Sequence, residues 1–258
     1  MIVTVTPNAA LDRTLVVPNF QLGQRHRASA ANTSAGGKGI NVARSLRRLG
    51  VPVVCTGLAG GRAGSQIVER LTGEGLLNDF VQIRSESRTS TAVIDPTSTV
   101  STEINEWGPE VDEPELVMLR DKLAYLSQGA DYVVFCGSLP RGVDDGLYAD
   151  LIRVVAKRGV PAVMDADGEP LRLGLQAEPA LVSPNQREAE QLVGHEFATA
   201  QDVVAGLDEV ARLGARNVLI TNADGCHALI RQDRTESRLR ARVPRLDAVS
   251  AIGAGDAL

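Results

Sequence analysis

Four residues near the end of the 258-residue chain, Gly253, Ala254, Gly255 and Asp256, combine two groups that can act together on an anion. Glycines allow backbone N–H groups to crowd around a negative charge, and the start of a helix adds the positive end of its dipole. A carboxylate beside such amides can accept a proton next to a bound phosphate. A tight turn is the alternative interpretation, and these four residues taken alone favour it.

Other polar clusters follow expected strands, where a parallel sheet would bring them to one edge. They are Asp12, residues 36–41, Arg88, residues 136–141 (CGSLPR), residues 185–188 and residues 221–225. Each has an ordinary structural explanation as well, since Asn185 and Glu188 suit a capping box and Ser138 suits a turn or helix cap. Their joint occurrence at strand ends, more than any single cluster, favours a ligand site.

The elements that must position these clusters follow from hydrophobic periodicity. Expected strands cover residues 2–6, 14–17, 27–32, 51–57, 132–136, 161–165, 181–183, 217–221, 228–230 and 239–243, and expected helices cover residues 40–49, 63–75, 115–127, 145–158, 201–213 and a segment from 186. Strands that alternate with helices predict an α/β fold with a doubly wound, mostly parallel sheet. We expect one domain over residues 1–258.

Two segments, about 12–32 and 88–105, do not alternate with helices and are rich in strand-forming residues. We therefore expect them to form a small separate β-sheet that stands over the ends of the main strands. A lid is one use for such a sheet, and a dimer surface is another.

Charge and composition exclude several classes of protein. A net charge of −5 at pH 7 does not favour nucleic acid or an anionic membrane as a partner. The chain lacks both a signal peptide and an apolar run of roughly 18 residues, so we expect a cytoplasmic protein. Cys55, Cys136 and Cys226 lie far apart in apolar stretches and are interpreted as buried thiols. An anionic substrate would need a local basic pocket, and Lys38, one of three lysines, lies in a glycine cluster.

Two glycine-rich segments fail to match nucleotide-binding motifs. Residues 36–39 lack a Ser or Thr after the lysine and a glycine five positions before it, so they are not a P-loop. Residues 57–64 miss the GxGxxG spacing, so we do not expect a dinucleotide site there.

Five segments, in order, resemble the PfkB (ribokinase-like) carbohydrate kinases. They are TVTPNAALDRT (4–14), GGKGINVAR (36–44), CGSLPRGV (136–143), SPNQREAE (183–190) and SAIGAGDA (250–257). The resemblance covers nearly the whole chain and implies a doubly wound α/β fold with a small β-sheet lid. The GGKGINVA form and TEINEWGPEV (102–111) look most like the branch that phosphorylates sugar phosphates, which includes 1-phosphofructokinase, tagatose-6-phosphate kinase and the minor 6-phosphofructokinase.

The resemblance implies that Asp256 is the catalytic base for phosphoryl transfer. It would take the proton from a free primary hydroxyl of the sugar as that oxygen attacks the γ-phosphate of ATP. The amides of Gly253, Ala254 and Gly255 would stabilise the developing charge.

The resemblance also implies a binding site for the sugar phosphate. Its expected residues are Asp12, Gly37, Lys38, Asn41, Arg88 and Ser138. Asp12 and Asn41 resemble ligands of sugar hydroxyls, with Gly37 allowing close approach of the backbone. Lys38 and Arg88 would neutralise the phosphate already on the sugar.

ATP and Mg²⁺ are the expected cofactors. The expected nucleotide-side residues are Asn185, Glu188, Thr221, Ala223, Asp224 and Gly225. Asn185 and Glu188 match the NxxE pattern of the family, and Glu188 would help to place Mg²⁺ through water. The chain departs from the family at Ser183, at Asp167 and in the TNADG loop (221–225), which replaces a glycine-rich SLGxxG.

The expected activity is ATP-dependent phosphorylation of a ketose phosphate, with fructose 1-phosphate to fructose 1,6-bisphosphate as the first choice. Tagatose 6-phosphate and fructose 6-phosphate are the alternatives. Relatives continue for several helices past Asp256, so we expect C-terminal helices to be missing, and a catalytically impaired phosphosugar-binding protein is a further alternative. The expected partners are a sugar phosphate, ATP and a second copy bound through the lid, and neither nucleic acid nor a membrane.

Overall fold

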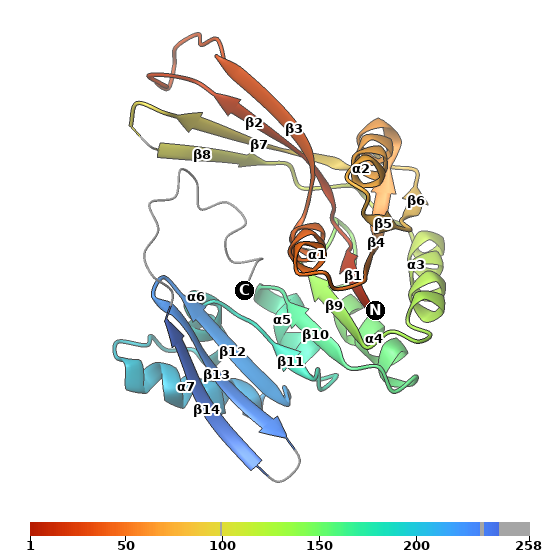
Figure 1. Cartoon of the computed structure of the whole chain (residues 1–258), viewed down its shortest axis with the longest axis vertical. Coiled ribbons are helices and arrows are strands. Elements are labelled where there is room, and N and C mark those ends of the chain that lie inside the picture. Colours follow the sequence, from red (N-terminus) through yellow and green to blue (C-terminus); the bar gives the residue numbers. More distant parts are fainter. Residues whose placement is uncertain (99, 233–234, 243–258) are drawn as a thin grey trace.

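A mostly parallel sheet forms the body of the molecule, and a smaller sheet stands at its upper end (Figure 1). The computed structural model describes residues 1–98, 100–232 and 235–242. Within these residues the main sheet has the order β14-β13-β12-β11-β10-β9-β1-β4-β5, with β6 paired to β4. Its strands are β1 (Ile2–Thr6), β4 (Val53–Gly60), β5 (Leu77–Asn78), β6 (Val81–Ile83), β9 (Tyr132–Cys136), β10 (Ala162–Asp165), β11 (Leu181–Val182), β12 (Asn217–Asn222), β13 (Gly225–Gln232) and β14 (Thr235–Arg242).

Strand β1 lies in the interior of this sheet, parallel to β4 on one side and to β9 on the other. The parallel series continues from β9 through β10 and β11 to β12, whereas β13 pairs antiparallel with both β12 and β14. Parallel strands end at the same edge of a sheet, which is where α/β folds bind ligands. We call the edge formed by the carboxyl ends of β1, β9, β10, β11 and β12 the rim.

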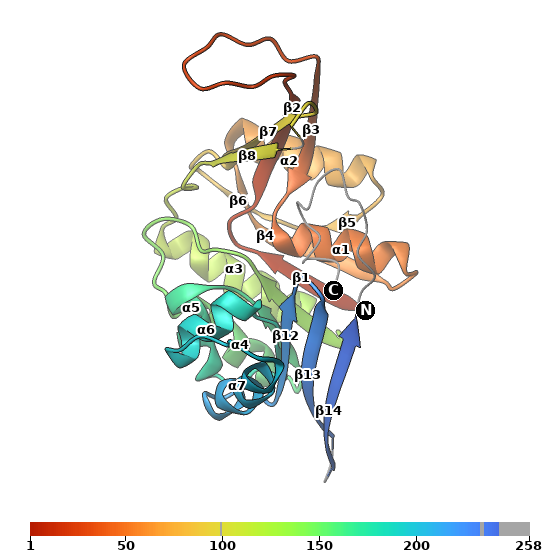
Figure 2. The same cartoon turned by 90° about the vertical axis from the view of Figure 1, so that its left-hand side faces the viewer.

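Helices cover both faces of the main sheet (Figure 2). They are α1 (Lys38–Arg48), α2 (Gly61–Gly73), α3 (Glu113–Leu126), α4 (Leu147–Ala156), α5 (Gly168–Leu175), α6 (Gln186–Val193) and α7 (Ala200–Arg212). Helices α1 and α2 bury Ile40 and Ile67 in one core, and α3 to α7 pack into a larger core on the other face. Successive side chains of β1 point to opposite faces of the main sheet. Val3 and Val5 join the larger core, while Thr6 lies against α1.

The first turn of α1 lies directly on the end of β1. A Cβ on Gly37, whose φ is +124°, would be 2.6 Å from Cγ2 of Thr6. A Cβ on Gly39 would be 2.5 Å from Oγ1 of Thr6 and 3.2 Å from the carbonyl oxygen of Val5. Two glycines therefore allow the helix to begin closer to the strand than any side chain would permit.

The smaller sheet consists of β2 (Ala10–Val16), β3 (Ala30–Gly36), β7 (Arg88–Asp95) and β8 (Val100–Asn105), in the order β3-β2-β7-β8. We call these four strands the lid. Strand β2 continues from β1 after a short turn, and it pairs antiparallel with β3 and parallel with β7. The lid therefore joins two segments of the chain that are far apart in the sequence.

Asp95 ties together two turns at the far end of the lid. Its buried carboxylate accepts hydrogen bonds from the backbone N–H groups of Asn19 (3.0 Å), Phe20 (3.1 Å) and Thr97 (2.9 Å). It also accepts from the hydroxyls of Thr97 (2.7 Å) and Ser98 (3.0 Å). Bonds from Thr97 above all, and then from Ser98 and Asn19, hold the pKa of Asp95 well below its usual value of 3.8.

The predicted fold class is confirmed, because a large, mostly parallel sheet and a small separate sheet are both present. The sequence missed α5, which begins in the turn-forming residues DADGEP, and the very short strands β5 and β6. Helix α5 depends on packing, since a Cβ on its Gly174 would lie 2.5 Å from Sδ of Met164 in β10. No helix in the described ranges is long and apolar enough to cross a membrane.

We expect Asp95→Ala to loosen the tip of the lid. The amides of Asn19, Phe20 and Thr97 lose their acceptor, so their hydrogen exchange should accelerate at least about five-fold. Because the folded pKa of Asp95 lies below the unfolded value, its contribution to stability is complete above pH 3.8 and is lost as the pH falls below that. The exposed Asp121→Asn change is the control, and equal exchange in both variants would contradict the role of Asp95.

Gly39→Ala tests the contact between α1 and β1. In an open helix this change stabilises by about 1 kcal/mol, whereas forcing a methyl group against Thr6 and Val5 should destabilise by about 1–3 kcal/mol. Urea unfolding measures the difference. Gly73→Ala is the matched control, because a Cβ on Gly73 of α2 meets no atom within 4 Å. Stabilisation in both variants would show that the contact does not limit the helix.

Candidate active site

The rim of the main sheet carries the polar clusters that the sequence places after strands. Asp165 ends β10 opposite Cys136 of β9, and its carbonyl oxygen accepts from the N–H of Gly137 at 2.9 Å. Further along, Asn185 forms a bridge with Thr221. Clusters that are separated by tens of residues in the sequence therefore lie side by side.

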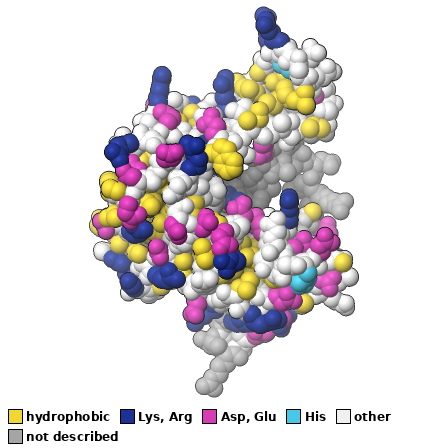
Figure 3. All heavy atoms as spheres, turned by 180° about the vertical axis from the view of Figure 1, so that it is seen from behind, with side chains coloured by type: hydrophobic (Ala, Val, Ile, Leu, Met, Phe, Trp, Pro, Cys, Tyr) yellow, Lys and Arg dark blue, Asp and Glu magenta, His cyan; other side chains and the backbone are white. Residues whose placement is uncertain are grey.

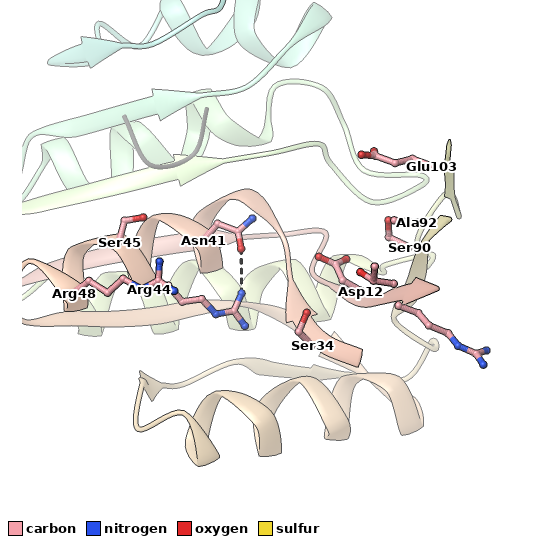
Figure 4. Close-up of a pocket in the computed structure, with 11 residues that line it drawn as sticks. Asp12, Ser34, Asn41, Arg44, Ser45, Arg48, Ser90, Ala92 and Glu103 are labelled. Atoms are coloured by element: carbon pink, nitrogen blue, oxygen red, sulfur yellow. Dashed lines mark hydrogen bonds between the residues drawn. The ribbon is translucent and has the colours of Figure 1, made fainter. Parts of the chain in front are cut away.

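A cavity of about 310 Å³ lies between the lid and α1 (Figure 4). It is lined by Asp12, Arg13, Thr14, Ser34, Asn41, Arg44, Ser45, Arg48, Ser90, Ala92 and Glu103. Two expected sugar ligands, Asp12 from β2 and Asn41 from α1, face this one space. The expected cations Lys38 and Arg88 are not among its lining residues.

Asp12 is held close to the end of β3. A Cβ on Gly36 would lie 2.0 Å from a carboxylate oxygen of Asp12, so the glycine leaves room for this side chain. Gly36 pairs with Ala10 across the lid, and Gly37 then begins α1. The end of β3 thus lies beside the side chain of Asp12, and the chain continues from there directly into α1, which carries Asn41.

Lys38 forms an ion pair across the rim. Its Nζ donates to Oδ1 of Asp165 at 3.0 Å, and both side chains are partly exposed. Asp165 was not among the expected site residues, although its position at the end of a strand was visible in the sequence. The pair connects the beginning of α1 to β10.

Arg88 begins β7 in the lid, and its side chain returns toward the rim. Its Nε donates to the backbone oxygen of Asn8 at 3.2 Å. Burial lowers the pKa of Arg88, and the carboxylates of Asp12 and Glu106 oppose that shift. This guanidinium is therefore a partly desolvated positive charge, which favours binding of an anion, although the carboxylate of Asp12 lies near it.

Ser138 lies in the turn that follows β9, and its hydroxyl accepts from Nδ2 of Asn8 at 3.1 Å. The buried hydroxyl of Tyr148 supports the same turn, because it lies within hydrogen-bonding distance of the carbonyl oxygens of Cys136 (3.0 Å) and Gly137 (2.8 Å). Burial raises the pKa of Tyr148, so the phenol remains protonated and can donate. Asn8 lies within the TVTPNAALDRT segment, whereas Tyr148 resembles any apolar helix residue and gave no signal.

Asn185 and Glu188 form a capping box at the start of α6. The Asn185 side chain accepts from the N–H of Glu188 and the Glu188 side chain accepts from the N–H of Asn185, both at 2.9 Å. Burial, followed by the nearby carboxylates of Asp165 and Asp167, raises the pKa of Glu188, while the N–H of Asn185 and the charge of Lys38 oppose the shift. The capping box expected at Asn185 and Glu188 is therefore present, and the Glu188 carboxylate lies close to the negative charges of Asp165 and Asp167.

These negative charges suit a divalent cation. Mg²⁺ prefers carboxylate and phosphate oxygens and retains several waters in most sites. In the described part of the chain no three His, Cys, Asp or Glu side chains are grouped to bind a metal directly. The carboxylates near Glu188 are oxygen ligands of the kind that Mg²⁺ prefers.

The remaining residues that were expected on the nucleotide side lie in the β12–β13 hairpin: Thr221 near the end of β12, Ala223 and Asp224 in the turn, and Gly225 at the start of β13. The N–H of Thr221 donates to the carbonyl oxygen of Pro184 at 3.1 Å, which brings this turn beside the start of α6. Gly225 has a φ of +136°, and a Cβ there would lie 2.1 Å from the carbonyl oxygen of Ala241. Gly225 thus has a packing role within the hairpin.

The glycine-rich turn before α2 already holds an anion from the protein itself. The carboxylate of Glu86 accepts from the N–H of Arg62 at 3.1 Å and from the N–H of Ala63. Two backbone N–H groups at the start of α2 are thus satisfied by a side chain of the protein. The other glycine nest, Gly253, Ala254 and Gly255 with Asp256, lies outside the described residues.

Comparisons with known proteins identify relatives of this arrangement. The model of the family described as pfkB family carbohydrate kinase matches residues 4–258. The 1-phosphofructokinase of Borreliella burgdorferi is 32% identical over 258 residues, which are 100% of this chain and 82% of that protein. The 1-phosphofructokinase of Rhodobacter capsulatus is 31% identical over 258 residues, 100% of this chain and 81% of that protein.

The structure is also similar to solved kinases. The crystal structure of phosphofructokinase-2 from Escherichia coli in complex with fructose-6-phosphate superimposes with a TM-score of 0.91 at 28% identity, covering 99% of this chain and 83% of that one. The family match, the relatives along the full chain and the shared two-sheet architecture agree with one another. The chain belongs to the pfkB family of carbohydrate kinases.

Proposed function

We propose that this carbohydrate kinase transfers the γ-phosphoryl group of ATP to the free primary hydroxyl of fructose 1-phosphate, giving fructose 1,6-bisphosphate and ADP. The observation that carries the proposal is that relatives named 1-phosphofructokinase align with the whole 258-residue chain at 31–32% identity. Fructose 6-phosphate is the second candidate, because it is the ligand named for the similar Escherichia coli structure. Tagatose 6-phosphate is the third.

In the proposed complex the sugar occupies the cavity between the lid and α1. Asp12 and Asn41, which line it from opposite elements, bind its hydroxyl groups. Gly37 keeps the backbone close to the sugar, and Ser138 contacts it from the turn after β9. The cavity is polar on both sides, which suits a ligand that carries hydroxyl groups around its ring.

Arg88 and Lys38 neutralise the phosphate already on the sugar. Arg88 is the stronger candidate, because a partly buried guanidinium gains more from a bidentate anion than a fully hydrated one does. Lys38 contributes from its ion pair with Asp165, so it can interact with the phosphate while it stays anchored to β10.

Asp256 accepts the proton of the sugar hydroxyl as the oxygen forms its bond to the γ-phosphorus. The bond from that phosphorus to the bridging oxygen breaks, and the electron pair leaves with ADP. The amides of Gly253, Ala254 and Gly255 donate to the oxygens on which negative charge develops. Positioning and charge neutralisation supply most of the catalysis in such a reaction.

The nucleotide binds along the rim beside α6. Thr221, Ala223, Asp224 and Gly225 contact it from the β12–β13 turn, and Asn185 and Glu188 orient the phosphates from the start of the helix. Bound Mg²⁺ would neutralise phosphate charge, and Glu188 would hold it through water. The raised pKa of Glu188 supports this placement, because a cation there relieves the repulsion from Asp165 and Asp167.

The biological setting is part of the proposal. A cytoplasmic location suits the use of ATP and a phosphorylated sugar. We also propose a homodimer formed through the lid, whose strand β8 is exposed along its whole length. Figure 3 shows apolar side chains gathered on the lid at the top of the view. Val100 and Ile104 of β8, and Leu22 in the connection between β2 and β3, are large apolar side chains that are exposed to solvent.

The full-length protein should release ADP from ATP and Mg²⁺ fastest with fructose 1-phosphate, compared with fructose 6-phosphate, tagatose 6-phosphate and unphosphorylated fructose. Asp256→Asn should reduce kcat by about 10²–10⁴-fold, because the general base is lost. Turnover that survives this change would remove Asp256 from the mechanism. Binding of a ketose phosphate with no turnover by the unaltered protein would favour a catalytically impaired phosphosugar-binding protein.

Arg88→Ala should raise KM for the ketose phosphate about 10–100-fold, because a charge-assisted bidentate contact is removed. KM for ATP should change little. Arg84→Ala is the control, since Arg84 lies four residues earlier and has an 83% exposed side chain that pairs with Asp112. An unchanged affinity for the phosphosugar in Arg88→Ala would favour an unphosphorylated sugar as the substrate.

A further inference from the structure

Arg44 of α1 is held in one orientation by three separate parts of the chain. Its Nε and Nη2 each donate at 2.7 Å to one of the two carboxylate oxygens of Glu74, which follows α2. Nη2 also donates to the carbonyl oxygen of Ala35 in β3 at 2.8 Å. Nη1 donates to Oδ1 of Asn41 at 3.0 Å.

The contact with Glu74 has the planar, two-point geometry of an arginine–carboxylate pair. Hydrogen bonding to Arg44 above all lowers the pKa of Glu74, with smaller contributions from the charges of Arg47 and Arg48, so the carboxylate is ionised at neutral pH. Both side chains are partly buried, at 21% and 34% exposure. A lysine could not reproduce this fork, because its ammonium is a single point of charge.

The bond from Arg44 decides which way the amide of Asn41 faces. A guanidinium carries donors and no acceptor, so a reversed amide would place N–H groups against N–H groups. The oxygen therefore faces Arg44, and the nitrogen points away from the guanidinium (Figure 4). The two residues lie three positions apart on α1, on the face that lines the cavity.

We infer that Arg44, held by Glu74, is a positioning residue that makes Asn41 present a hydrogen-bond donor to the sugar. The proposal rests on the proposed function, in which Asn41 binds a sugar hydroxyl. It adds the polarity of that contact, because Nδ2 recognises a hydroxyl oxygen as an acceptor. Glu74, although outside the cavity lining, thereby controls a substrate contact.

A mutant cycle on the full-length protein tests this arrangement. Titration calorimetry measures the affinity for fructose 1-phosphate in the unaltered protein and in the Arg44→Ala, Asn41→Ala and doubly substituted variants. Each single change should weaken binding about ten-fold, as expected for a hydrogen bond to a ligand, and the double change should be no weaker than Asn41→Ala. KM for ATP should remain unchanged.

Two further variants separate positioning from charge and from loss of the fold. Arg44→Lys keeps the positive charge and loses the fork, so it should bind the sugar phosphate as weakly as Arg44→Ala does. Arg47→Ala is the matched control, because Arg47 lies on the same helix and donates to the backbone oxygen of Glu74, and it should bind normally. If Arg44→Ala fails to fold, the affinity of Arg44→Lys for the sugar phosphate is compared with that of the unaltered protein instead.

Restored affinity in Arg44→Lys, or effects of Arg44→Ala and Asn41→Ala that add fully, would overturn the positioning role in favour of a simple charge effect. Sugar-phosphate binding by all variants at the strength of the unaltered protein would overturn it as well. If the unaltered protein binds none of the ketose phosphates, the proposed function itself fails and takes the inference with it.

Discussion

The close contact between the first turn of α1 and the end of β1 sets the geometry of the whole site. Gly37 and Gly39 leave so little space above Thr6 that a methyl group would collide with the strand. Because β1 lies inside the sheet and continues into the lid, this contact positions three things at once. It places Lys38 within reach of β10, it sets Asn41 one turn along the helix, and it fixes the helix relative to the strand that carries Asp12.

Three cations near the candidate site lie close to carboxylates before any ligand arrives. Lys38 is paired with Asp165, Arg44 with Glu74, and the charge of Arg88 lies near Asp12. Unpaired ions in a partly desolvated site would be costly, whereas paired ones hold their side chains in fixed positions. In the proposed complex a phosphorylated sugar therefore meets side chains that are already oriented. Preorganisation of this kind lowers the entropy lost on binding.

Much of this arrangement could be predicted from the sequence, because local signals record local geometry. The alternation of strands and helices predicted the sheet, and the segments containing Asp12 and Asn41 predicted two residues that do line one cavity. Ion pairs over long separations could not be predicted: Lys38 and Asp165 are 127 residues apart, and Arg44 and Glu74 are 30 apart. Hydrophobic periodicity in the sequence does not indicate which charged residues will pair, because only the folded structure brings them together. Helix α5 was missed for a related reason, because its glycine is explained by packing against Met164.

Two of the chain crossings that connect the lid to the body lie next to each other, one leading into β2 and the other into β7. Ala10 at the start of β2 pairs with Arg88 at the start of β7, so both crossings enter the small sheet in the same register. If the lid changes its tilt relative to the main sheet, Asp12 and the backbone of Arg88 must therefore move together, because β2 and β7 are paired. The spacing between the backbone of Asp12 and that of Arg88 is thus a property of the β2–β7 strand pair, whatever the position of the lid relative to the rim.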